Sequence, residues 1–150
     1  MLRYQENNEL HRPFHGSLDN AMRFVEKTCG IDGLKEVLRI TGRDVYRSIR
    51  EKLAKGDSSE LIEHLCWFFH REGAPFRLTV RDNEIRFEVF ECPAHKQLRK
   101  MGLEPASFNC LQTSEVNAGM CEGTPWTSSV EHVAPGHCIQ IFTRGEEKPA

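Results

Sequence analysis

Apolar positions in the N-terminal half of the chain recur at the three- to four-residue spacing of amphipathic helices. This spacing predicts three helices, over about 17–30, 32–55 and 57–70. Ser17 is a favourable N-cap for the first, and a glycine follows the last apolar position of each of the first two. Gly42 interrupts the second apolar stripe, where we expect another element to approach closely.

In the C-terminal half the period changes to two, with apolar residues alternating with polar ones. This pattern predicts two β-hairpins, each with one buried and one solvated face. Less regular sequence between them indicates one short helix and a second that is weaker. The expected ranges are 76–81 and 84–89 for the first hairpin, 94–101 and about 107–118 for the helices, and 126–133 and 137–143 for the second hairpin.

The predicted order ααα-ββ-α(α)-ββ indicates an α+β fold. Because the strands come in hairpin pairs, we expect an antiparallel sheet with helices packed on one side. Residues 17–144 are predicted to form a single domain, preceded by a polar arm over 1–16 and followed by a frayed tail over 145–150. A chain of 150 residues is long enough to bury a core of this kind.

The composition of the chain argues against nucleic-acid and membrane partners. The formal net charge is −2, so no overall excess of basic residues favours nucleic acid. The longest apolar run, Leu65–Phe69, is far shorter than a membrane span, and the first residues lack the apolar segment of a secretory signal. We therefore expect a cytoplasmic protein with no nucleic-acid or membrane partner, whose six cysteines are free thiols.

Four of the cysteines fall in the C-terminal half, and three of these are candidates for a shared site. Cys92 lies near the predicted start of a helix, where the helix dipole favours a thiolate, and His95 follows one turn later. Cys110 in a loop and Cys138 at a strand start are placed to converge with them. Such a set fits either a nucleophilic cysteine with a histidine base or a metal held by three sulfurs and a histidine.

Other residues are weaker candidates. Arg77 and Arg86 could hold a carboxylate from the first hairpin, although a solvated strand face is the better explanation of them. Trp126 is predicted to line the core or a pocket. Cys29 and Cys66, in the helical half, are expected to be core residues. The acid that would assist a catalytic cysteine stays open among Glu91, Glu115, Glu122 and Glu131.

The run over 88–142 resembles the L-2-amino-thiazoline-4-carboxylic acid hydrolase family. The matching positions are Cys92-Pro93, the segment from Leu98 to Gly102, Cys110, and Gly136 with Cys138. In this chain Cys138 comes one residue sooner after the glycine than in the family pattern, and Glu115 is the nearest acid after the central cysteine. The element order is also similar to that of 4-vinyl reductase domains, which bind small molecules and sometimes a cysteine-bound metal.

The resemblance implies a cysteine-dependent hydrolase that opens a C–N bond of a small cyclic amidine or thiazoline without a cofactor. Cys92 or Cys110 would be the nucleophile and His95 the acid/base, with Arg77, Arg86 and Trp126 contacting the substrate. The alternative is a small-molecule or metal-binding sensor domain with zinc or iron on Cys92, Cys110 and Cys138. Either hypothesis is compatible with a homodimer. In a third, the cysteines only fill the core and the chain is an interaction partner.

Overall fold

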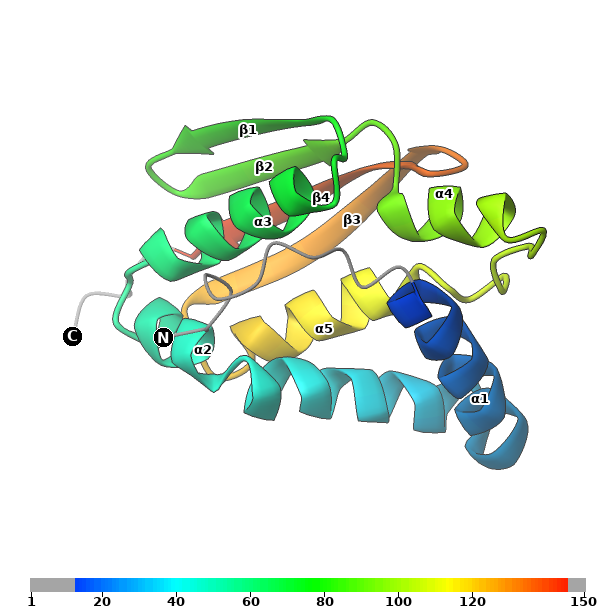
Figure 1. Cartoon of the computed structure of the whole chain (residues 1–150). Coiled ribbons are helices and arrows are strands. Elements are labelled where there is room, and N and C mark those ends of the chain that lie inside the picture. The colour runs from blue at the N-terminus through cyan, green and yellow to red at the C-terminus, as the bar shows by residue number, and fades with distance from the viewer. Residues whose placement is uncertain (1–12, 146–150) are drawn as a thin grey trace.

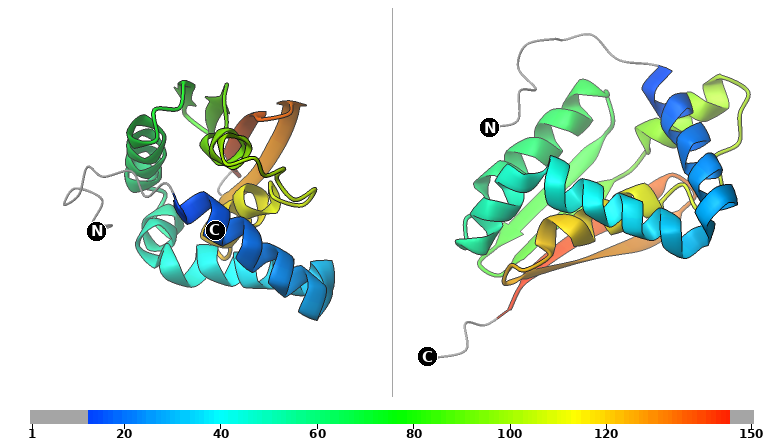
Figure 2. Two further views of the ribbon diagram at one scale, coloured as in Figure 1. Left: turned by 45° about the vertical axis from the view of Figure 1, so that its right-hand side comes forward. Right: turned by 90° about the horizontal axis from the view of Figure 1, so that it is seen from below.

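A computed structural model of the chain describes residues 13–145 and has the predicted α+β fold (Figure 1). One four-stranded antiparallel sheet carries the helices on a single face (Figures 1 and 2). In chain order the elements are α1 (Pro13–Ile40), the π-helix η1 (Thr41–Val45), α2 (Arg47–Ala54), α3 (Ser59–Arg71), β1 (Phe76–Arg81), β2 (Glu84–Val89), α4 (Pro93–Lys100), α5 (Leu111–Cys121), β3 (Trp126–Ala134) and β4 (His137–Arg144).

Helix α1 is longer than predicted and is bent. It begins at Pro13 rather than Ser17, and proline is well suited to the first helical position because its φ is already helical. The predicted break is present at Gly30, where φ is 73° and ψ is 178°, but helical structure continues on both sides of it. Residues 13–16 of the expected polar arm are therefore helical, and the rest of the arm lies outside the described residues.

The predicted second helix is divided into the second limb of α1, the π-helix η1 and α2. Helix α5 crosses at this point. A Cβ added to Gly42 would lie 2.1 Å from the Val116 carbonyl oxygen, and one added to Gly119 would lie 2.2 Å from the Arg39 carbonyl oxygen. Both glycines are needed for this backbone approach, and the wider π-turn accompanies it.

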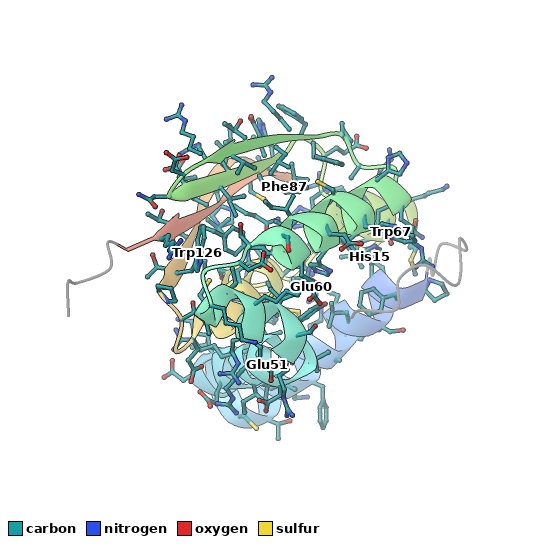
Figure 3. The ribbon with its side chains drawn as sticks, turned by 90° about the vertical axis from the view of Figure 1, so that its left-hand side faces the viewer. His15, Glu51, Glu60, Trp67, Phe87 and Trp126 are labelled. Atoms are coloured by element: carbon teal, nitrogen blue, oxygen red, sulfur yellow. The ribbon has the colours of Figure 1, made fainter. Side chains whose placement is uncertain are left out.

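The strand order is β1-β2-β4-β3, so the two hairpins meet along β2 and β4. Val89 pairs with Cys138 across this junction. Alternate residues of each strand face the helices, as Phe87 on β2 does (Figure 3). The ring centroids of Phe87 and of Phe69 on α3 are 5.0 Å apart. The main core lies in this layer, and its fully buried members include Ile49, Leu53, Leu61, Ile85, Phe87, Val89, Met120 and Phe142.

A second, smaller core joins the two limbs of α1 to α5. Its buried residues are Met22, Leu34 and Leu38. Cys66 and Cys29, two cysteines outside the candidate set, differ in their burial. Cys66 packs against the main core as expected, whereas Cys29 is exposed and not a core residue, because it lies beside the bend of α1. Within residues 13–145, no helix combines the length and the apolar character that crossing a bilayer requires.

Candidate functional site

The fold brings three of the predicted thiols to one end of the sheet. Cys92 follows β2 and is the N-cap residue of α4. Its backbone N–H donates a 2.7 Å hydrogen bond to the carbonyl oxygen of Gly136, in the turn before Cys138. A Cβ on Gly136 would lie 3.9 Å from the Cys92 Cβ and 3.8 Å from the His95 Cβ, so the β3–β4 turn packs directly on the start of α4.

Cys110 joins this group from the opposite side. It precedes α5, and its Sγ lies 3.7 Å from Nε2 of His95, one turn into α4. His95 is partly buried, and its Nδ1 is fully buried without a hydrogen-bond partner among the residues that the structure describes. His137, by contrast, lies on the other face of the sheet, where its Nε2 is 2.9 Å from Glu88.

The electrostatics of the cluster keep its sulfurs protonated. Burial raises the pKa of Cys92, and this outweighs the lowering by hydrogen bonds from the backbone at His95 and Ala94. Burial, together with the neighbouring Cys92, also raises the pKa of Cys110. The pKa of Cys138 rises to about 12, mainly through burial and then through Cys92 and Cys110.

The expected thiolate at the start of α4 is therefore not favoured, because burial has a larger effect than the helix N-terminus. Burial also lowers the pKa of His95. At neutral pH the pair consists of a neutral imidazole and a neutral thiol. This arrangement permits general-base activation of Cys110 and does not provide a preformed thiolate.

The alternative metal site is not supported by the geometry. Among residues 13–145, no three His, Cys, Asp or Glu side chains are placed to hold one metal ion. Tetrahedral zinc requires sulfurs about 2.3 Å from the ion, and hence less than about 4 Å from one another. The thiols of Cys92, Cys110 and Cys138 are close enough to affect one another's charge, but they do not form such a ligand set.

Asp19 holds the segment that carries Cys110, a role that the sequence did not reveal. Its carboxylate accepts hydrogen bonds from Arg23 Nε (2.8 Å), the Ala106 backbone N–H (3.1 Å) and Asn109 Nδ2 (2.7 Å). Burial raises the pKa of Asp19, but these hydrogen bonds outweigh it and hold the pKa below its usual value. Asp19 thus ties α1 to the loop that ends at Cys110.

The predicted substrate-contacting residues lie elsewhere. Arg77 and Arg86 are on the opposite face of the sheet, 3.7 Å and 3.5 Å from glutamate partners, and they do not reach the thiols. Trp126 is a core residue paired with Arg144 in the β3–β4 register, six residues along β4 from Cys138, or roughly 20 Å. The simpler interpretations therefore apply: the two arginines belong to a solvated strand face, and Trp126 is a core ring.

None of the candidate acids contacts His95. Each of the four is beside a basic side chain elsewhere: Glu91 with Lys96, Glu115 with Arg39, Glu122 with Arg43 and Glu131 with Arg86. The described residues therefore place no carboxylate in the position of the third member of a catalytic triad.

A cavity of about 470 Å³ lies between α1, α3, α5 and the sheet. Cys92 is part of its wall, which connects the cavity to the thiol cluster. Exposed Phe14, Val37 and Val45 line it together with buried residues, so part of its wall reaches the surface formed by residues 13–145. The buried apolar lining residues include Met22, Leu34, Leu38, Leu65 and Met120.

No family model, curated protein or solved structure matches the chain. The resemblance to the thiazoline hydrolases therefore stays a prediction, and function has to be argued from the geometry. The cavity itself was not predicted, because its walls come from six elements spread along the sequence, α1, η1, α3, α4, α5 and β4. A weak signal was present in the apolar residues of the first helix, which are more numerous than one packing stripe requires.

Proposed function

We propose that the protein binds a small, largely apolar molecule in the cavity between α1, α3, α5 and the sheet. The observation that carries this proposal is the size and character of the cavity. Protein interiors are packed to crystal-like density, and voids much larger than one water molecule are rare. At about 470 Å³ the cavity is roughly three times the size of an engineered one that holds benzene, and it falls in the range of natural ligand sites.

The lining supports a neutral ligand. None of the described residues that line the cavity is Asp, Glu, Lys or Arg. Two histidines also line the cavity: burial lowers the pKa of His64 to about 4, so its ring is neutral, and Nε2 of His15 is 3.1 Å from the Glu72 carboxylate. An ionised ligand would lose its hydration without gaining a partner of opposite charge, which is strongly unfavourable.

The test is binding of the fluorescent apolar probe N-phenyl-1-naphthylamine. Thr113, on the α5 wall of the cavity, is replaced by phenylalanine to fill it. Thr127→Phe, on the exposed face of β3, is the matched control. We expect one equivalent of probe to bind wild type and the control equally, and Thr113→Phe to weaken binding at least tenfold. Equal binding by all three proteins, or no binding to wild type, contradicts the proposal.

A second proposal is that the Cys110–His95 pair hydrolyses a small cyclic amidine or thiazoline. It is favoured by one observation, the 3.7 Å contact between Sγ and Nε2. His95 would accept the Cys110 proton while the sulfur adds to the C=N carbon. The ring C–N bond would then break with return of the proton to nitrogen, and water would release the product from sulfur.

Ring opening of 2-aminothiazoline-4-carboxylate, followed by mass spectrometry, tests this second proposal. Cys110→Ser and His95→Gln should each abolish turnover. Cys29→Ser, which changes an exposed thiol away from the cluster, should retain it. Turnover that survives in Cys110→Ser excludes this residue as the nucleophile, and the same assay on Cys92→Ser then tests the other candidate.

A further inference from the structure

The cavity contains a polar pair that its apolar walls do not explain. Asn117 on α5 and Gln140 on β4 line the cavity with only 4% and 3% of their surfaces exposed. Asn117 Nδ2 donates a 2.8 Å hydrogen bond to Gln140 Oε1. Two buried amides at the centre of an otherwise hydrophobic layer lose hydration, so their remaining polar atoms require partners.

The bond between the two amides leaves half of each amide free. Among the described residues, Asn117 Oδ1 and Gln140 Nε2 have no hydrogen-bond partner. Exchanging oxygen and nitrogen in both side chains reverses the bond and again leaves one donor and one acceptor. In either orientation the pair keeps one N–H donor and one C=O acceptor, and both residues line the cavity.

We infer that the ligand of the cavity carries a neutral carboxamide or lactam group, which the Asn117–Gln140 pair recognises. This inference rests on the proposed binding function and specifies its ligand class. The N–H of such a group would donate to the free amide oxygen of the pair, and its C=O would accept from the free amide N–H. The apolar walls would hold the rest of the molecule.

The site excludes two related ligand classes. A carboxylate offers two acceptors and no donor, and it would stand opposite the free amide oxygen without a cation among the lining residues. A ketone or ester can accept from the N–H but leaves the amide oxygen unpaired. Sites that are built to hydrogen-bond a ligand group discriminate strongly against analogues that lack it.

Two compounds of nearly equal size, 2-naphthamide and 2-acetylnaphthalene, test the inference by isothermal titration calorimetry. They differ only in NH₂ against CH₃ on the carbonyl. We expect wild type to bind the amide at least tenfold more tightly than the ketone. Equal affinity for the two overturns the amide inference but leaves the cavity proposal intact, whereas binding of neither compound overturns both.

The double variant Asn117→Leu/Gln140→Met assigns any preference to this pair. It replaces both amides by apolar side chains of similar shape, a change that leaves no unpaired partner. We expect it to bind the two compounds with equal affinity, and a retained tenfold preference overturns the role of the pair. The ligand comparison in wild type requires no variant, so it decides the inference even if the double variant does not fold.

Discussion

Replacement of Asp19 tests how the site is held together. Its carboxylate is 4% exposed and accepts hydrogen bonds from three donors, two of which belong to the segment before Cys110. Asp19→Ala removes the acceptor of two buried donors, the Ala106 N–H and Asn109 Nδ2. At about 1–3 kcal/mol for each orphaned donor, the free energy of unfolding should fall by about 2–6 kcal/mol. The exposed Arg23 adds little to this sum.

The same carboxylate predicts a pH dependence with a definite sign. Because the pKa of Asp19 is lower in the folded than in the unfolded protein, its contribution is complete above about pH 4 and is lost as pH falls through the folded-state pKa. The stability difference between wild type and Asp19→Ala should therefore be large at pH 7 and should shrink towards pH 3.

Urea unfolding followed by circular dichroism measures both effects, with Asp44→Ala as the control. Asp44 pairs with Arg43 on the surface, so its loss should change the free energy of unfolding little. Alkylation of Cys110 should also accelerate in Asp19→Ala, because the loop loses its anchor. A destabilisation below 1 kcal/mol that does not vary between pH 7 and pH 3 would refute the assigned role.

Three further predictions concern packing, protonation and thiol access. Gly42→Ala should lower the free energy of unfolding by at least about 2 kcal/mol in urea titrations, because its Cβ meets a carbonyl oxygen. Gly16→Ala, which meets only the flexible end of Met101, should be nearly neutral. Wild type should lose stability in thermal melts as pH falls from about 6.5 towards 4, and His64→Phe should flatten this loss, since neutral His64 must gain a proton on unfolding. Peptide mapping after iodoacetamide treatment should find exposed Cys29 modified first, whereas Cys121, with its pKa raised to about 12 by burial, should react only on unfolding. Early labelling of Cys121 would contradict this prediction. Unchanged stability of Gly42→Ala, or wild-type stability that does not vary with pH, would contradict the other two.

Local patterning predicted the elements well where one face of a helix or strand is apolar. The alternation in both hairpins placed β1 to β4 within one residue of their ends, since a period of two follows directly from one buried face. Helix α5 was placed several residues too early because its sequence is almost evenly apolar around the helix, with little contrast between faces. The π-turn of η1 was missed, because it depends on the helix that packs against it.

The sequence by itself determined the α+β order, the antiparallel hairpins and which side chains could supply thiol chemistry, because these follow from residue type and from near neighbours along the chain. Only the tertiary structure decided that Cys92, His95, Cys110 and Cys138 lie together while Arg77, Arg86 and Trp126 do not. The tertiary structure also sets the protonation state of the thiols, and it creates the cavity that contains the Asn117–Gln140 pair. The physical reason is that burial and proximity are properties of packed elements, and positions distant in the sequence acquire them only when the strand register and the helix crossings are set.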